Sequence, residues 1–264
     1  MELNVPVFKT SDPVVVIAGG VGPMAGVEFH RDLLVMNSQA TRDCDHWDTL
    51  HVAFPSMIPD RTHFLRTGNG ENPGHVIARL IQPYLQLLRE SRREYAVMVP
   101  CATFHAPVIL DAFKAALGDA IKGRFVSMVD PAVTRAIQYG PRVGFMSTSG
   151  SRIGRVWDSG IEQAGGISCV LDRERQEELH EAIYQPGYGL KAVTPPSEAA
   201  VARLQDCIDN LCDQGANSII LGCTELPLAE TRLRTHGAAL IDPGKEIARA
   251  LQSQMPHKEY LLAT

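Results

Sequence analysis

Two cysteines, Cys101 and Cys223, each follow a short aliphatic run by two positions. The runs are residues 95–99 and 218–221, and the cysteines stand 122 positions apart. Such runs predict buried strands, so each thiol is expected where a strand ends and a loop begins. Ligands of open α/β sheets bind at that edge. Two thiols brought together there could form a disulfide, hold a metal ion, or serve as acid and base.

The other cysteines help to weigh these alternatives. The chain has six cysteines, and no pair has the C-x2-C spacing of zinc ribbons or thioredoxin-like motifs. A reducing compartment also disfavours a structural disulfide. Cys207 and Cys212 fall within a predicted amphipathic helix at 198–214 and are expected to pack as small hydrophobic residues. Potential metal ligands at 43–47 lie in a polar connection, so we expect no metal site.

The composition is that of an ordinary globular protein. Hydrophobic residues make up 45% of the 264 residues and charged residues 21%. The formal net charge of -5, without a lysine or arginine run, argues against a nucleic-acid surface and favours small-molecule partners. The N-terminus lacks the pattern of a signal peptide, and no apolar stretch is long enough for a membrane span. We therefore expect a cytoplasmic protein with no membrane partner.

Strands and helices are predicted to alternate in two similar halves. We expect an α/β fold of two pseudo-symmetric domains, each a short parallel sheet flanked by helices, with the active site in the inter-domain cleft. The predicted domains are residues 12–125 and 126–241, and segment 242–264 is expected to pack back on the first. The predicted strands are residues 14–18, 51–54, 95–99, 142–146, 167–171 and 218–221. The predicted helices are residues 25–37, 76–90, 198–214, about 245–254, and one near residue 156.

A glycine-rich turn at residues 19–23 follows the first strand. Such turns before a helix can cradle phosphates, but the spacing here is not that of a dinucleotide fingerprint, and no P-loop motif is present. A turn whose backbone N–H groups face a carboxylate is the better interpretation. A polar turn at 147–151 takes the corresponding place in the second half.

Five motifs in this order resemble those of one enzyme family over nearly the whole chain. They are GGVGP at 19–23, IPDRT at 58–62, PCATFH at 100–105, GCTE at 222–225 and IDP at 241–243. The chain resembles the cofactor-independent aspartate/glutamate racemases. The resemblance implies an isomerase that needs no pyridoxal phosphate or other cofactor and acts on aspartate, glutamate or a related amino acid. Members of this family often dimerise, which is the only indication of a homodimer.

The resemblance implies that Cys101 and Cys223 lie on opposite faces of the substrate's α-carbon. One sulfur then removes the α-proton as a thiolate, and the other returns a proton as a thiol. The matching family arginine makes Arg61 the expected specificity residue, because a guanidinium binds a carboxylate bidentately. His105 is equally consistent with tuning Cys101 and with a structural role.

Further residues are expected to hold the substrate's polar groups. Hydroxyls could orient the α-carboxylate, and the two turns could stabilise the carbanion through backbone N–H groups. The predicted set, besides Arg61, comprises Gly20, Thr103, Thr148, Ser149, Thr224 and Glu225.

Several positions depart from the family pattern. Ala102 replaces an asparagine, and Met24 stands where a glutamate is frequent. Aspartate racemases use a lysine of the second domain for the distal carboxylate, and our alignment puts Glu177 there, with Arg173 or Arg175 as possible substitutes. These departures leave the substrate less defined than the reaction. The irregular connection after residue 185 could cover the cleft.

Two other classes of function stay open. One is a related cysteine reaction, such as cis-trans isomerisation of an unsaturated diacid or decarboxylation of a malonate. A decarboxylase needs only one proton donor, so two cysteines disfavour it. The other is a non-catalytic protein that binds a small molecule in the same cleft.

Overall fold

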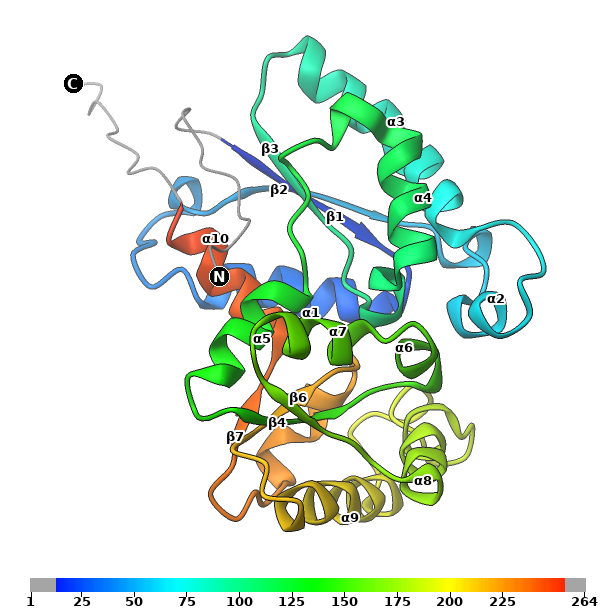
Figure 1. The fold of residues 1–264 in the computed structure, drawn as a ribbon. Coiled ribbons are helices and arrows are strands. Elements are labelled where there is room, and N and C mark those ends of the chain that lie inside the picture. Colours follow the sequence, from blue (N-terminus) through cyan, green and yellow to red (C-terminus); the bar gives the residue numbers. More distant parts are fainter. Residues whose placement is uncertain (1–12, 255–264) are drawn as a thin grey trace.

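The first sheet carries the strand that leads to Cys101. In the computed structural model, which describes residues 13–254, β1 (Val14–Gly19) lies between β2 (Asp48–Ala53) and β3 (Tyr95–Met98) (Figure 1). Both pairings are parallel. All of β1 is buried, because a central parallel strand covered on both faces needs a continuous apolar run.

The second sheet carries the strand that leads to Cys223. Its order is β5-β4-β6-β7 and all its pairings are parallel. The bounds are β4 (Arg142–Met146), β5 (Ile167–Cys169), β6 (Ser218–Leu221) and β7 (Ala239–Ile241). The predicted α/β architecture with two parallel sheets is therefore confirmed. The sequence did not predict β7, and β5 ends two residues earlier than expected.

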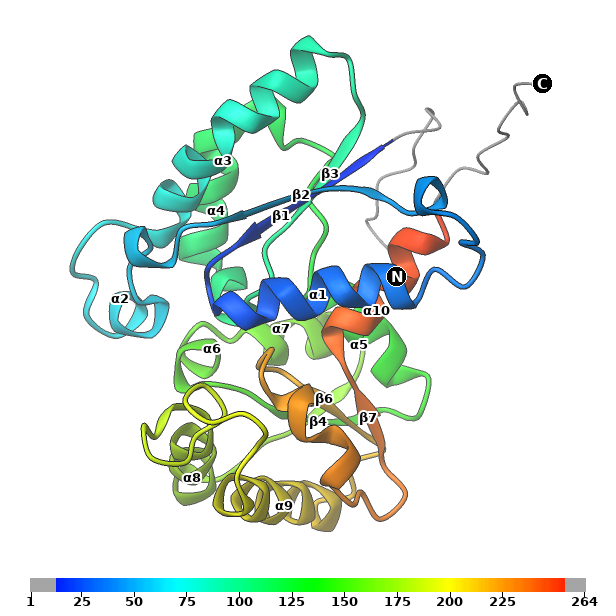
Figure 2. The same cartoon turned by 180° about the vertical axis from the view of Figure 1, so that it is seen from behind.

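Helices cover both faces of each sheet (Figures 1 and 2). On the first sheet, α3 and α4 lie on the outer face and α1 on the face towards the second sheet, while α8 and α9 lie on the outer side of the second sheet. The bounds are α1 (Pro23–Val35), α2 (Arg61–Thr67), α3 (Pro73–Glu90), α4 (Pro107–Leu117), α5 (Val129–Ile137), α6 (Ser149–Ile153), α7 (Val156–Gln163), α8 (Arg173–Tyr184), α9 (Glu198–Asp213) and α10 (Pro243–Gln252). Short 3-10 helices η3 (Ala102–His105) and η5 (Leu226–Arg232) follow the two cysteine loops.

The last described helix lies between the two sheets and joins them. α10 packs against α1 of the first half and α5 of the second. Its Ile247 belongs to a buried cluster that also contains Phe29 from α1, Val133 from α5 and Trp157 from α7. The predicted domain boundaries at 125/126 and 241/242 stay a prediction, and residues 12 and 255–264 of those ranges lie outside the described residues.

Two residues determine where the helices next to the cleft begin. Gly22 has φ 87°, a left-handed conformation that favours glycine, and it lets the chain turn sharply from β1 into α1, which starts with Pro23. Asp60 begins α2 because its side chain accepts a hydrogen bond from the His63 backbone N–H at 2.6 Å. This cap makes Arg61 the first residue of the helix. The sequence analysis did not predict this helix.

The shared core predicts that α10 stabilises both halves. Replacing Ile247, which is fully buried, with alanine removes three carbons from this core and is expected to cost about 2–5 kcal/mol in the free energy of unfolding. Val35→Ala, at a side chain 69% exposed on α1, should change it by less than about 0.5 kcal/mol. Urea denaturation of both variants measures the difference, and equal stabilities would contradict this role of α10.

Candidate active site

The two cysteines line one cavity between the sheets. Cys101 follows β3 and Cys223 follows β6, and both side chains are buried. The cavity is narrow, with a volume of about 20 Å³, and its walls come from both halves of the chain. All six cysteines are free thiols. The other lining residues are Val21, Arg61, Thr62, Ala102, Thr103, Thr148, Tyr184, Lys191, Gly222, Thr224 and Glu225.

Arg61 brings a cation with spare hydrogen-bonding capacity into this cavity. Its Nη1 donates to the Pro59 carbonyl at 3.3 Å, but its buried Nε has no hydrogen-bond partner among the described residues. Burial alone would lower the pKa of Arg61, but the charges of Cys101 and Asp60 outweigh this and raise it. A buried donor without a partner costs free energy. An anionic ligand would satisfy it.

Lys191 is a site residue that the sequence analysis missed. It lies in the irregular connection after α8, and its Nζ donates to Glu225 Oε1. Burial alone would lower the pKa of Lys191, but the charges of Cys223 and Glu225 outweigh this and raise it. Lys191 is the only lysine between residues 126 and 241. The resemblance to aspartate racemases implies a lysine in the second domain, and this count was the signal in the sequence that could have pointed to Lys191.

The prediction that Glu177 takes the place of this lysine is wrong. Glu177 lies on the outer face of α8, is 69% exposed in its side chain and pairs with Arg173 at 3.1 Å. Arg175 is also turned away from the cavity and pairs with Glu178 at 2.5 Å. Helical periodicity directs these positions outward, whereas Tyr184 at the end of α8 and the connection that follows it return to the cleft.

Glu225 holds a negative charge beside Cys223. Burial alone would raise the pKa of Glu225, but the charge and hydrogen bond of Lys191 outweigh this and lower it. Its Oε2 accepts hydrogen bonds from Cys223 Sγ at 3.0 Å and from Thr224 Oγ1 at 3.2 Å. Burial, and then the charge of Glu225, raise the pKa of Cys223 well above its usual range. Cys223 is therefore a protonated thiol in this arrangement.

The two thiols thus have unlike surroundings. Arg61 and Lys191 place positive charge near Cys101, whereas Cys223 lies near Lys191 and also donates a hydrogen bond to the anion of Glu225. A cation favours a negative sulfur and an anion disfavours it. The arrangement suits proton transfer, in which one sulfur starts as a base and the other as an acid.

A cluster of three hydroxyls connects the two halves across the cavity wall. Thr103 Oγ1 lies 2.9 Å from both Thr148 Oγ1 and Ser151 Oγ. Thr148 also begins α6 by accepting a hydrogen bond from the Ser151 backbone N–H at 3.3 Å. At Gly150 a Cβ atom would lie 2.5 Å from Thr62 Oγ1, so the close approach of α6 and α2 requires glycine. Thr103 and Thr148 both line the cavity, as does Thr224.

His105 has a structural environment rather than a place in the cavity. Its Nε2 accepts a hydrogen bond from the Met128 backbone N–H at 3.0 Å, so its Nδ1 carries the proton and donates to the Cys101 carbonyl at 3.0 Å. Burial lowers the pKa of His105 to about 4. The neutral ring therefore ties the backbone of Cys101 to the start of α5.

Two residues of the predicted substrate-binding set do not line the cavity. The α-carbon of Gly20 faces the backbone nitrogens of Phe54 and Pro55, and Ser149 Oγ lies 3.4 Å from His180 Nδ1. Tyr184, the last residue of α8, lines the cavity without having been predicted. Burial, followed by the charges of Cys223 and Cys101, raises the pKa of Tyr184, so its phenol stays protonated.

Other site types find little support among residues 13–254. No group of three or more potential ligands is placed to hold a metal ion within that range. Three of the potential ligands at 43–47 lie in η1 (Asp43–Asp45), where Asp45 accepts hydrogen bonds from Thr41 and Arg42. Within the same range, no helix combines the length and apolar character needed to cross a bilayer.

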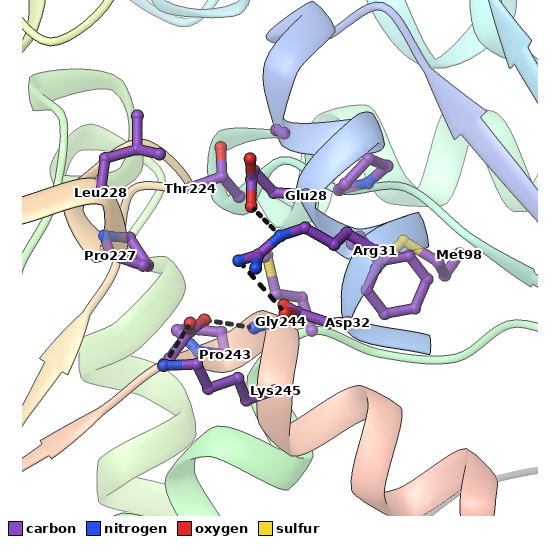
Figure 3. Close-up of a pocket in the computed structure, with 15 residues that line it drawn as sticks. Glu28, Arg31, Asp32, Met98, Thr224, Pro227, Leu228, Pro243, Gly244 and Lys245 are labelled. Atoms are coloured by element: carbon purple, nitrogen blue, oxygen red, sulfur yellow. Dashed lines mark hydrogen bonds and ion pairs between the residues drawn. The ribbon is translucent and has the colours of Figure 1, made fainter. Parts of the chain in front are cut away.

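A second cavity, of about 460 Å³, lies between α1, α10 and η5 (Figure 3). Neither cysteine lines it, but Thr224 lines both cavities. Arg31 points into it and pairs with Glu28 at 2.8 Å. Burial and the nearby charge of Asp242 raise the pKa of Asp32 from 3.8 to about 6.

The raised pKa of Asp32 predicts a loss of stability as pH rises. The unfolded chain releases this proton near pH 4 and the folded protein near pH 6, so stability falls between these values. Asp32→Asn should remove about 1 kcal/mol of that fall. Denaturation at pH 4 and pH 7 tests this, with exposed Asp111→Asn as the control. An equal fall in the Asp32 variant would contradict the assignment.

Comparisons with known proteins agree with this architecture. The family model for Asp/Glu/hydantoin racemases matches residues 19–251. The fold is similar to that of Picrophilus torridus aspartate racemase, with TM-score 0.67, 22% identity, and coverage of 92% of this chain and 94% of that chain. It is also similar to glutamate racemase from Francisella tularensis subsp. tularensis in complex with D-glutamate, with TM-score 0.61, 13% identity, and coverage of 92% and 80%.

A further relative comes from Pectobacterium carotovorum subsp. carotovorum and is named an uncharacterized protein in pnlA 3'region. It is 29% identical over 132 residues, which span 48% of this chain and 83% of that protein. Because the two solved structures have low sequence identity to this chain, their similarity shows that they share its fold.

Proposed function

Because the chain belongs to the Asp/Glu/hydantoin racemase family, we propose that it inverts the α-carbon of an acidic amino acid by cofactor-independent proton transfer. The observation that carries this proposal is the meeting of Cys101 and Cys223 in one cavity. Each thiol follows the carboxyl end of a parallel strand, one from each half of the chain. A two-base inversion needs an acid and a base that reach opposite faces of the same carbon.

The unlike surroundings of the thiols support an order of events. Cys101, beside Arg61, takes the α-proton as a thiolate while Cys223 gives its thiol proton to the opposite face. One C–H bond breaks and one forms, so Cys101 ends as the thiol and Cys223 as the thiolate. The reverse transfer inverts the other enantiomer and restores the starting state. The net charge of the site does not change.

The remaining lining residues support an acidic substrate. Arg61 and Lys191 supply two cations for two carboxylates, and the hydroxyls of Thr103, Thr148 and Thr224 supply further donors. Donors fixed in place before the reaction stabilise the negative charge that develops on the carboxylate as the α-proton leaves. Ala102 forms an apolar part of the wall where the family asparagine would offer an amide. The homodimer stays a prediction.

The two-thiol mechanism predicts separate losses in single-cysteine variants. In deuterated water, the wild type should exchange the α-proton of aspartate or glutamate and form the other enantiomer. Cys101→Ser and Cys223→Ser should each lower inversion at least about a thousandfold, because serine is a far weaker acid than cysteine. Proton NMR follows exchange, and chiral chromatography follows inversion.

The matched control is Cys212→Ser, since Cys212 lies outside the cavity and its thiol donates to the Thr235 carbonyl at 3.1 Å, as a hydroxyl can. This variant should keep wild-type activity. Full inversion in either Cys101→Ser or Cys223→Ser would sink the two-base proposal. If the wild type exchanges the α-proton of neither aspartate nor glutamate, these two amino acids are excluded as substrates.

Arg61 is expected to need its guanidinium and not merely a positive charge. Arg61→Lys keeps the charge but loses the planar pair of donors, so kcat/KM for the acidic amino acid should fall about 10- to 100-fold. Arg66→Lys, at an exposed position of the same helix, should leave kcat/KM unchanged. Steady-state kinetics with both variants tests this, and equal values would argue against carboxylate binding by Arg61.

A further inference from the structure

Apart from the two cysteine sulfurs, the charged side chains that line the cysteine cavity are two cations and one anion. Arg61 and Lys191 are the cations, and Glu225 is the anion. An acidic amino acid has the opposite set, with two carboxylates and one ammonium group. A plain dicarboxylate has the two carboxylates alone. The charge pattern therefore matches the first ligand completely and the second only in part.

We infer that Glu225 is a specificity-determining residue that selects ligands with an ammonium group against plain dicarboxylates. This inference rests on the proposed function, because it concerns the substrate class of the same site. On binding, Lys191 leaves Glu225 for a substrate carboxylate, and the ammonium group takes the place of Lys191 beside Glu225.

The contacts of Glu225 show why its partner matters. Its side chain is only 5% exposed, and Lys191 is its only cationic partner among the described residues. Cys223 and Thr224 also donate to it, but both are neutral donors. A buried carboxylate that loses its cation is strongly destabilised. Lys191 can turn to a ligand only if another positive group arrives.

The first half of the chain lies close to the ion pair of Lys191 and Glu225. A Cβ atom on Gly22 would lie 2.7 Å from Glu225 Oε1 and 3.4 Å from Lys191 Nζ. The glycine turn between β1 and α1 therefore leaves just enough room for the pair. Charges in such a closed site are poorly screened by solvent, so a missing partner has a large effect.

A plain dicarboxylate cannot complete this exchange. If it takes Lys191, Glu225 remains as an unpaired buried anion close to two added carboxylates. If it leaves Lys191 in place, one of its own carboxylates lacks a cation. Either outcome weakens binding, and we expect a preference of about 100-fold for the amino acid.

The test compares ligands that differ only in the ammonium group. Dissociation constants for L-aspartate and succinate, and for L-glutamate and glutarate, are measured by calorimetry with wild type and Glu225→Gln. Glutamine keeps the size and an acceptor oxygen but removes the charge. For the pair that binds better, the wild-type preference of about 100-fold should fall below about 10-fold in Glu225→Gln, with tighter binding of the dicarboxylate.

Two further variants keep the result interpretable. Glu177→Gln removes an exposed carboxylate of α8 outside the cavity and should keep the wild-type preference. Glu225→Asp keeps the negative charge and should retain most of the preference. The preference in Glu225→Asp decides the question if Glu225→Gln does not fold.

Three results would overturn the inference. The preference could be the same in wild type and Glu225→Gln, it could be lost entirely in Glu225→Asp, or the wild type could bind neither amino acid better than its dicarboxylate partner.

Proton exchange in deuterated water separates a failure of this inference from a failure of the proposed function. Exchange together with an unchanged preference would leave the racemase proposal standing and remove the role of Glu225. If the preference falls in Glu225→Gln but the wild type exchanges no α-proton, the role of Glu225 in ligand selection stands and the racemase proposal is removed.

Discussion

A charge buried between the two sheets must find an opposite charge, and this requirement links the parts of the site. Glu225 follows Cys223 by two residues, so the strand that delivers the thiol also delivers a carboxylate. Lys191 meets this carboxylate from a connection 34 residues earlier in the chain. Without that lysine, the carboxylate would be buried without a cation, which proteins rarely tolerate. The fold of the irregular connection and the state of the thiol are therefore coupled.

The same burial makes the two thiols unequal. In water both sulfurs would behave alike, because solvent would screen the neighbouring charges. In the cavity, Arg61 and Lys191 interact with Cys101, whereas Cys223 has both Lys191 and the anion of Glu225 beside it. The second cysteine motif carries an acid, Glu225, two positions after its cysteine, where the first motif carries the uncharged Thr103. His105, four positions after Cys101, is neutral and held by two backbone groups, so it adds no charge.

The sequence predicted those parts of the molecule that depend on local pattern. Apolar runs identified β1, β3 and β6, and the position of each cysteine after its strand, repeated in two similar halves, predicted a shared cleft. Arg61 was found from its motif, although the helix that it begins was not, because a single capping aspartate is a weak signal without a long apolar period. β7 was missed because three residues at a sheet edge have too little pattern.

The rest depends on contacts between distant segments. Tyr184 reaches the cavity from the end of α8, and Lys191 reaches it because the chain then turns back towards the cleft. No local sequence pattern predicts the direction of that turn. Glu177 was misplaced because alignment along a helix ignores which face looks inward. Charge pairing adds a second criterion, because a buried Glu225 requires a cation. The second half contains one lysine but nine arginines, so the sequence leaves several candidates. The contact between Lys191 Nζ and Glu225 Oε1 in the structure identifies the partner.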